Sequence, residues 1–348
     1  MSKLCSIILA AGEGKRMKSS SPKVLSEVLF KPMLKWVVDS VNDSGIKNVC
    51  VVAGYKSEKI ENYLSFANIH SEIALQKERK GTAHAVMMAT EFLQKNLDSD
   101  VLILGGDAPF IDSKTIKDSY ALHKRENNSA TVISAKLDNP YGYGRIVRNK
   151  DNLKLNSIVE EKDANEIVKN ITEVNSGVYW FKVADLLSVL TNISNNNAQG
   201  EYYLPDAICL LLEKGKSVNA FVSDSSEIVM GANDCMQLYD LNRIAKDKVL
   251  NSLMNDGIRI PFTDGVIIGT EVKIKRGTTI LPGTIIDGNT SVGENCIIGP
   301  NSQIHNSIIE NNVVFNSSYC KDSYINSNQK IGPFDTVINN NDAFGIQF

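Results

Sequence analysis

Two glycines and three basic residues near the N-terminus have the types and spacing that suit a phosphate-binding loop. Gly12 and Gly14 lie two residues apart, and Lys15, Arg16 and Lys23 follow them. Because glycine has no side chain, the backbone N–H groups beside it can approach a phosphate or the edge of a base closely. The basic side chains would neutralise a polyphosphate. The pattern predicts nucleotide binding, although a strand-to-loop turn with solvated basic residues is an alternative.

The spacing differs from the two common phosphate-binding motifs. Met17 stands where the dinucleotide-binding motif has its third glycine. The Gly-x4-Gly-Lys-Ser/Thr spacing of the P-loop is also missing. The apolar run Leu4–Leu9 precedes the glycines and predicts a buried parallel strand. The loop is therefore expected to follow the carboxyl end of a strand.

The elements that must position this loop alternate between strands and helices. Further strands are predicted at 48–53, 73–76, 101–104 and 130–135, and helices at 31–43, 57–64 (with Ser57 as N-cap), 82–93 and 113–125. This alternation predicts a parallel sheet with right-handed crossover connections, whose ligands bind beyond the carboxyl ends of the strands. Gln76, Gly81-Thr82 and Asp107 also follow strand ends, so we expect them to join the glycine loop in one site.

The pattern changes after Tyr141. Segments 142–147, 157–160 and 174–181 are extended, and they predict an antiparallel insertion or lid on the sheet. Helices at 183–190 and 201–212 and a strand at 218–222 are expected next. The amphipathic segment 234–254 predicts a long linker helix.

A six-residue period begins beyond the linker. An aliphatic residue recurs at every sixth position from Ile268 to Ile304, at Ile268, Ile274, Ile280, Ile286, Val292, Ile298 and Ile304. The series continues at intervals of five or six at Ile309, Phe315, Cys320, Ile325, Ile331 and Val337. Neither an α-helix nor a plain sheet requires a period of six, whereas a hexapeptide-repeat β-helix does. These positions predict about four turns with a stacked aliphatic core.

Length and charge narrow the class of protein. A chain of 348 residues is too long for one ordinary core and predicts two domains. The net charge of −3 gives no bulk attraction to nucleic acid or to anionic membranes. No apolar run approaches the roughly 20 residues that span a bilayer, and the early first strand leaves no room for a signal peptide. Six scattered cysteines favour reduced thiols in the cytoplasm.

Short motifs spread along the chain match those of one enzyme family. They are Leu9-Ala10-Ala11-Gly12-x-Gly14-x-Arg16-Met17, Pro22-Lys23, Gln76-x4-Gly81-Thr82, Gly106-Asp107, Gly142-Tyr143-Gly144-Arg145, Val159-Glu160-x-Lys162, Asn175-Ser176-Gly177, the run Asn195 to Tyr203, and Gly231-x-Asn233. The run Asn-Asn-Asn-Ala-Gln-Gly-Glu-Tyr-Tyr is the most specific of them. On these motifs the chain resembles the bacterial bifunctional N-acetylglucosamine-1-phosphate uridylyltransferase/glucosamine-1-phosphate acetyltransferase family, which serves cell-wall biosynthesis.

The resemblance implies an α/β fold of two parts. The first part is a Rossmann-like sugar-nucleotidyltransferase domain at 1–230, followed by a helical linker at 231–256. The second is a short left-handed parallel β-helix at 257–340, followed by a C-terminal tail at 341–348.

The resemblance also implies a reaction and a set of site residues. A sugar-1-phosphate oxygen would attack the α-phosphorus of UTP, with Mg²⁺ as cofactor and pyrophosphate leaving. Arg16 and Lys23 would be the catalytic residues, and Asp107 and Asn233 the metal ligands. The residues expected to bind the nucleotide are Leu9, Ala10, Ala11, Gly12, Gln76, Gly81, Thr82, Gly106 and Asp107. Those expected to bind the sugar are Gly144, Glu160, Asn175 and Asn233.

Two departures from the family pattern carry expectations of their own. Gly105 stands where many relatives have tyrosine, so one contact to the nucleotide is expected to be missing. After Ile331-Gly332-Pro333-Phe334, the family has a basic segment for acetyl transfer, whereas here no basic residue follows Lys330. We therefore expect no acetyltransferase activity, and a β-helix that serves as the stem of a homotrimer.

Three other functions stay open. The enzyme could use another nucleotide (dTTP or ATP) or another sugar-1-phosphate, against which the asparagine-rich run counts. It could be a non-catalytic regulatory paralogue, but Lys23, Asp107 and Asn233 are all retained. A β-helix acyltransferase is disfavoured by the missing basic groups.

Overall fold

The computed structural model describes residues 3–149 and 153–340. These residues form two compact units with separate hydrophobic cores. The first unit comprises residues 3–26, 32–149 and 153–237, and the second comprises 27–31 and 238–340. The expected domain boundaries at 230 and 256 stay a prediction. The expected tail at 341–348 lies outside the described residues.

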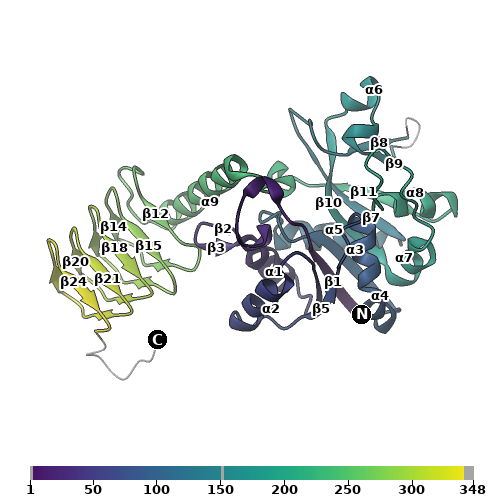
Figure 1. Ribbon diagram of the computed structural model, residues 1–348. Helices are drawn as coiled ribbons and strands as arrows, with labels where there is room; N and C mark the ends of the chain where they lie inside the picture. Colours follow the sequence, from purple (N-terminus) through teal and green to yellow (C-terminus); the bar gives the residue numbers. More distant parts are fainter. Residues whose placement is uncertain (1–2, 150–152, 341–348) are drawn as a thin grey trace. The chain divides into compact units, whose positions relative to one another are not determined.

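A nine-stranded mixed sheet forms the centre of the first unit (Figure 1). Its main path is β11 (Val218–Val222), β7 (Ala130–Lys136), β10 (Glu173–Lys182), β6 (Ser99–Gly105), β1 (Lys3–Ala10), β4 (Asn48–Ala53) and β5 (Glu72–Leu75). β1 is parallel to β4 and β6, and β4 is parallel to β5, so these strands end at one edge. β8 (Arg145–Arg148) and β9 (Leu155–Val159) form an antiparallel pair that joins the sheet through β10. The expected α/β fold is confirmed.

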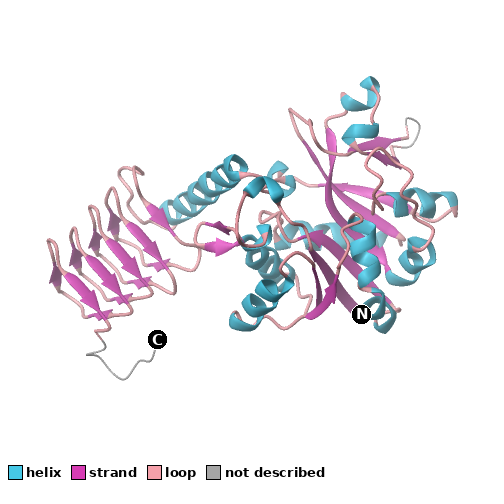
Figure 2. Ribbon diagram, in the orientation of Figure 1, coloured by secondary structure: helices cyan, strands magenta, loops and turns pink. Residues whose placement is uncertain are grey.

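Helices cover both faces of this sheet (Figure 2). Neighbouring residues of a strand point to opposite faces, and so Ile7 packs in one core while Ile8 packs in the other. The core around Ile7 includes side chains of α3 (Thr82–Met88), α4 (Thr90–Lys95), α7 (Val183–Leu190) and α8 (Asp206–Glu213). The core around Ile8 includes those of α1 (Met33–Asp43), α2 (Ser57–Phe66) and α5 (Ser113–Arg125). A short helix, α6 (Glu166–Lys169), follows β9.

Two elements differ from the prediction in type or continuity. Segment 174–181 is not part of a lid, because it forms β10 and lies antiparallel between β6 and β7 in the main sheet. Its apolar residues Val178 and Trp180 are fully buried, which explains this central place. The expected helix 82–93 is two helices, α3 and α4. At their junction the Thr90 hydroxyl donates to the carbonyl of Met87 at 2.6 Å and competes with helical backbone bonding.

Three helices begin later than predicted, or with a different cap. α1 begins at Met33 because Lys31–Pro32 forms strand β3. Ser57 is the first residue of α2 rather than its N-cap, which is Lys56 with a left-handed φ of 51°. The helix expected from residue 201 begins at Asp206, after Pro205, because the preceding run contains turns instead.

The second unit is a left-handed parallel β-helix (Figure 1). Its strands stack in three parallel sheets, β12-β15-β18-β21-β24, β13-β16-β19-β22 and β14-β17-β20-β23. Their bounds are β12 (Ile267–Ile268), β13 (Lys273–Ile274), β14 (Thr279–Ile280), β15 (Ile285–Asp287), β16 (Ser291–Val292), β17 (Ile297–Ile298), β18 (Gln303–His305), β19 (Ile308–Ile309), β20 (Val314–Phe315), β21 (Tyr319–Lys321), β22 (Tyr324–Ile325), β23 (Lys330–Ile331) and β24 (Thr336–Ile338). Ile286 pairs with Ile268 one turn earlier and with Ile304 one turn later. The hexapeptide prediction is confirmed, including the positions with looser spacing.

Helix α9 (Cys235–Asn255) and an early segment of the chain accompany the β-helix. Leu250 of α9 lies in the β-helix core. Residues 27–31, from the hairpin of β2 (Glu27–Val28) and β3 (Lys31–Pro32), also belong to the second unit. There the N–H of Leu29 donates to Asn242 at 2.8 Å, and Lys31 pairs with Glu271 at 2.8 Å.

In the ranges that the structure describes, no helix has both the length and the apolar composition needed to cross a membrane. All six cysteines are free. Burial raises the pKa of the Cys5 thiol, and likewise that of Cys50, to about 12.

Candidate active site

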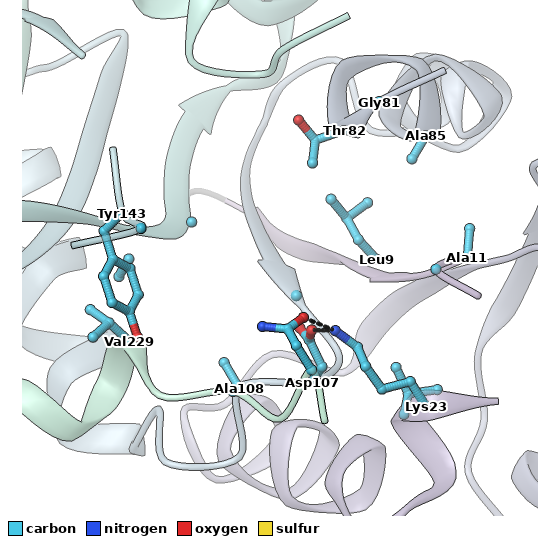
Figure 3. Close-up of a pocket in the computed structure, with 18 of the residues that line it drawn as sticks. Leu9, Ala11, Lys23, Gly81, Thr82, Ala85, Asp107, Ala108, Tyr143 and Val229 are labelled. Carbon is cyan, nitrogen blue, oxygen red and sulfur yellow. Dashed lines mark hydrogen bonds and ion pairs between the residues drawn. The ribbon is translucent and has the colours of Figure 1, made fainter. Parts of the chain in front are cut away.

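A cavity of about 700 Å³ lies at the carboxyl ends of β1, β5 and β6 in the first unit (Figure 3). Its walls come from the loop after β1, segment 76–85, residues 105–108, the turn 141–143, residues 176–177 and residues 229–237. The predicted site residues that line it are Leu9, Ala11, Gly12, Arg16, Lys23, Gln76, Gly81, Thr82, Asp107 and Asn233. The fold thus brings residues from distant parts of the sequence to one edge of the sheet.

The other predicted site residues do not line the cavity directly. Ala10 points into the hydrophobic core. Gly106 is buried, and its N–H donates to the carbonyl of Leu9 at 2.9 Å. The expected sugar-binding residues Gly144, Glu160 and Asn175 are also absent from the lining, although Gly144 and Asn175 directly adjoin lining residues in sequence.

Lys23 contacts both predicted metal ligands. Its ammonium pairs with the carboxylate of Asp107 and donates to Oδ1 of Asn233 at 3.0 Å (Figure 3). Lys23 starts a short 3-10 helix, Asp107 follows β6, and Asn233 precedes α9. Gly14 has a φ of +62°, and a Cβ at this position would lie 2.7 Å from Cβ of Lys23. The second glycine of the motif therefore allows the loop to pass close to the lysine.

The two oxygens around the Lys23 ammonium are suitable donors for Mg²⁺. Mg²⁺ is a hard cation that proteins bind through one or two carboxylates, with waters and substrate phosphates completing the shell. Here one carboxylate, of Asp107, and one amide oxygen, of Asn233, already converge on a single positive charge. Among the described residues, no cluster of three or more His, Cys, Asp or Glu side chains has a metal-binding arrangement. Such a small set of protein donors suits a metal ion whose remaining ligands are water and the phosphates of a bound nucleotide.

The asparagine-rich run supports one wall of the cavity. The N–H of Tyr202 donates to the carbonyl of Lys80 at 2.7 Å, and its carbonyl accepts from the N–H of Ala83 at 2.9 Å. The hydroxyl oxygen of Thr82 accepts from the N–H of Leu204 at 3.0 Å. The run was predicted only as a family motif, and its spacing gave no indication that it would hold the turn before α3.

Gly81 and Gln76 are fixed in this turn. Gly81 has a φ of +105°, and a Cβ there would lie 2.5 Å from the carbonyl oxygen of Tyr202. The buried side chain of Gln76 donates to the carbonyl of Gly81 at 3.2 Å and lies 2.9 Å from Nδ1 of His84. The amide of Gln76 is therefore held by the same turn that supplies the glycine.

Three of the four predicted sugar-binding residues, Gly144, Glu160 and Asn175, lie together. Gly144 lies against the carboxylate of Glu160, because a Cβ on Gly144 would be 3.1 Å from Oε1. The N–H of Asn175 donates to the carbonyl of Gly144 at 2.8 Å. The side chain of Asn175 donates to the hydroxyl of Tyr179 at 2.6 Å, within the sheet. These three residues form a continuous group beside the cavity.

The carboxylate of Glu160 has an unfavourable environment for its charge. Burial raises its pKa above the usual range, and the charges of Asp163 and Asp206 raise it further. Hydrogen-bond donors that approach such a carboxylate would stabilise its ionised form. A ligand with hydroxyl groups would supply such donors.

Sequence reasoning missed Arg79, Ser176 and Gly177 as lining residues. Arg79 forms an ion pair with Glu13 and lies 6.0 Å from the ring centre of Tyr55, so it connects the glycine loop to the segment after β5. Its position between two motif residues was the available signal. Ser176 and Gly177 belong to the motif Asn175-Ser176-Gly177, which was the available signal, and they lie at a β-bulge of β10 that spacing alone does not reveal.

Two protein families match the chain. The family described as Nucleotidyl transferase matches residues 5–234, and the family described as Bacterial transferase hexapeptide (six repeats) matches residues 271–306. The first match covers the sheet-containing part, and the second covers a central part of the β-helix.

The chain is similar to two curated bacterial proteins over nearly all its length. The bifunctional protein GlmU of Caldanaerobacter subterraneus subsp. tengcongensis is 45% identical over 334 residues, which cover 96% of this chain and 72% of that protein. The bifunctional protein GlmU of Acetivibrio thermocellus is 45% identical over 335 residues, with 96% and 71% covered. A crystal structure from Bacillus anthracis, described as a glucose-1-phosphate thymidylyltransferase in complex with sucrose, matches with a TM-score of 0.60 at 20% identity, covering 70% of this chain and 96% of that one. At that identity it indicates a shared fold only.

Proposed function

This chain belongs to the family of the bifunctional GlmU proteins, and we propose that it transfers UMP from UTP to N-acetylglucosamine-1-phosphate, releasing pyrophosphate. It is a nucleotidyltransferase, and the choice of nucleotide and sugar is the proposal. The observation that supports it most directly is the contact of Lys23 with Asp107 and Asn233 inside the cavity. The cavity volume of about 700 Å³ also falls within the range of small-molecule sites, roughly 300–1,000 Å³.

The chemistry requires charge neutralisation and alignment more than proton transfer. An oxygen of the sugar-1-phosphate attacks the α-phosphorus of UTP, and the bond to the bridging oxygen of pyrophosphate breaks. Because the attacking phosphate is already ionised, no side chain has to remove a proton from it. We assign Lys23 to the α-phosphate and Arg16 to the rest of the triphosphate. Both basic residues line the cavity.

The metal would be held by the chain's own oxygens at the same place. Asp107 and Asn233 would bind Mg²⁺, which when bound would supply positive charge to the phosphates of the nucleotide. Removing Mg²⁺ with a chelator is expected to abolish pyrophosphate release.

The two substrates would occupy opposite walls. The backbone of residues 9–12, together with Gln76, Gly81 and Thr82, would hold the uracil and ribose. Gly144, Glu160 and Asn175 would contact the sugar, with the Glu160 carboxylate accepting from a hydroxyl group. Its raised pKa fits a carboxylate that gains from such donors.

A panel of substrates tests the proposal. Pyrophosphate release would be measured with UTP, dTTP and ATP, each combined with N-acetylglucosamine-1-phosphate, glucosamine-1-phosphate or glucose-1-phosphate in the presence of Mg²⁺. We expect the highest kcat/KM for UTP with N-acetylglucosamine-1-phosphate. A preference for another pair would favour the alternative of a different sugar-nucleotidyltransferase, and inactivity with all pairs would favour a non-catalytic paralogue.

Two further expectations stay predictions. Acetyl transfer from acetyl-CoA to glucosamine-1-phosphate is expected to be undetectable, since residues 335–340 supply no basic group for the phosphates of the cofactor. The hexapeptide repeats favour self-association, and light scattering is expected to give the mass of a homotrimer.

A further inference from the structure

Arg145 is a buried cation that the proposed mechanism does not use. It lies at the start of β8, and 1% of its surface is exposed. Arginine is almost never buried to this extent unless its donors are paired. Leaving such a charge in the protein interior is costly unless nearby acceptors satisfy it. Its partners therefore indicate what its burial achieves.

The guanidinium bonds to two backbone carbonyls and one carboxylate, which come from three separate parts of the chain. One terminal nitrogen donates to the carbonyl of Tyr143, two residues earlier. Nε and the other terminal nitrogen donate to the carbonyl of Lys169 at 3.3 and 3.2 Å. That second nitrogen also pairs with the carboxylate of Glu161 at 2.8 Å. The same carboxylate oxygen accepts from the N–H of Gly142 at 3.2 Å.

These contacts adjoin two of the expected sugar-binding residues, Gly144 and Glu160. Gly142 and Tyr143 line the cavity, and Gly144 follows them directly. Glu161 is the neighbour of Glu160, whose carboxylate lies against Gly144. Arg145 therefore connects the turn that carries Gly144 to the segment that carries Glu160, so both are set by one rigid group.

We propose that Arg145 is a positioning residue for the sugar-1-phosphate: its guanidinium fixes turn 142–144 against Glu160. This inference depends on the proposed function for the identity of the ligand, but not for the role of the arginine in the turn. Lysine would keep the charge but not all of these contacts, because a single ammonium lacks the planar fork that reaches the two carbonyls and the carboxylate together.

Arg148 provides a matched control on the same strand. Its guanidinium forms a bidentate pair with Glu173 at 2.7 and 2.6 Å, and it donates to the carbonyls of Leu153 and Ala220 at 2.9 and 3.3 Å. It has a comparable number of partners, but none of them lines the active-site cavity, whereas Arg145 bonds to the cavity-lining Tyr143. Loss of Arg148 should therefore affect the strand pair without changing the turn 142–144.

The experiment compares Arg145→Met, Arg145→Lys and Arg148→Met. With Arg145→Met we expect the KM for the sugar-1-phosphate to rise by about tenfold or more, while the KM for UTP changes by less than about twofold. Arg145→Lys should give a smaller change in the same direction, and it keeps the charge should Arg145→Met not fold. Arg148→Met should leave both KM values near those of the unchanged protein.

Amide hydrogen exchange provides a readout without substrate. We expect the exchange of residues 141–144 to accelerate in both Arg145 variants and to stay unchanged in Arg148→Met. Unchanged exchange in the Arg145 variants, or an equal rise of both KM values, would overturn the proposal. If the unchanged protein transfers no nucleotide at all, the proposed function fails, and the exchange comparison still decides the role of Arg145 in the turn.

Discussion

The ammonium of Lys23 lies between the two predicted metal ligands, Asp107 and Asn233. The ammonium contacts the carboxylate of Asp107 and the amide oxygen of Asn233, which are the oxygens that Mg²⁺ would need. In the folded chain the lysine thus offsets the charge of Asp107 and keeps the two oxygens together. During the proposed reaction, the same positive charge is required at the α-phosphate.

Replacing Lys23 by methionine tests this assignment. The change removes the charge while retaining most of the apolar stem, and we expect kcat to fall by about 10²–10³-fold because a group that stabilises developing charge is lost. Pyrophosphate release under saturating substrates measures the effect. The control is Lys35→Met, which removes a lysine paired with Asp39 on the surface of α1. Activity of Lys23→Met close to that of the control would contradict a catalytic role.

Glu160 makes a pH-dependent prediction. Because its folded pKa lies above the unfolded value, the folded state binds a proton more tightly, and stability decreases as pH rises through this window. Above this window the half-buried carboxylate therefore costs folding free energy. We expect Glu160→Gln to raise Tm at pH 7.5, and to have a smaller effect below the usual pKa of glutamate. Thermal melts at both pH values measure this.

The same variant is expected to bind the sugar less well. An amide is a weaker acceptor than a carboxylate, so the KM for the sugar-1-phosphate should rise while Tm at pH 7.5 also rises. In the unchanged protein this KM should increase as the pH falls through the raised pKa. A variant that is less stable at pH 7.5, or whose KM is unaltered, would count against the assignment of Glu160.

The sequence indicated site residues best where they are close together along the chain. The glycines, Arg16 and Lys23 form one local pattern, and simple chemistry predicts its affinity for phosphate. Asn233 could be paired with Asp107 only through the family resemblance, since nothing in the spacing connects them. Arg145 was part of a motif, but its burial depends on contacts with Glu161 and Lys169, which lie 16 and 24 residues further along the chain.

At the scale of elements, the apolar periodicity predicted the existence of strands and helices better than their positions in the fold. The central strands and α5 matched their expected positions because their apolar residues have a clear spacing. The apolar pattern of β10 also predicts an insertion strand, because an antiparallel central strand has the same pattern, and the structure shows the central place. The helix expected from residue 201 begins only at Asp206, and the backbone of Tyr202 and Leu204 instead holds the turn before α3.

Gly81→Ala tests that turn. An alanine at this position would have a strained backbone, because the φ of Gly81 is +105°. Its Cβ would also lie 2.5 Å from the carbonyl oxygen of Tyr202, so the turn has to move. We expect a loss of about 1–3 kcal/mol in unfolding free energy. The KM for UTP should rise, because Gln76 and Thr82 belong to the same turn. Urea unfolding and steady-state kinetics measure the two effects.

Gly215→Ala is the matched control for this change. Gly215 also has a positive φ, of +69°, but no atom lies within 4 Å of its added Cβ. It should lose about 1 kcal/mol from backbone strain alone, with no change in the KM for UTP. Equal kinetic behaviour of the two variants would show that the contact with Tyr202 does not matter for the nucleotide.

At the scale of the whole molecule, the two units have separate cores of different construction. The first contains side chains from both faces of a sheet, whereas the second is a stack in which each turn packs on its neighbours. The six-residue period predicted this stack well, because every turn repeats the same local requirement. The early segment 27–31 was not predicted to belong to the second unit, since its membership depends on contacts with Asn242 and Glu271.

Separate cores predict two transitions in calorimetry. Ile304 is fully buried between Ile286 and Cys320 in the β-helix, so Ile304→Ala should cost about 2–5 kcal/mol and lower the transition of the second unit. UTP with Mg²⁺ binds the folded first unit in our proposal, and it should raise the other transition by mass action. Each perturbation should thus move one transition and leave the other in place. A single transition that responds to both would mean that the units unfold together, and the assignment of independent stability to the two cores would then be wrong.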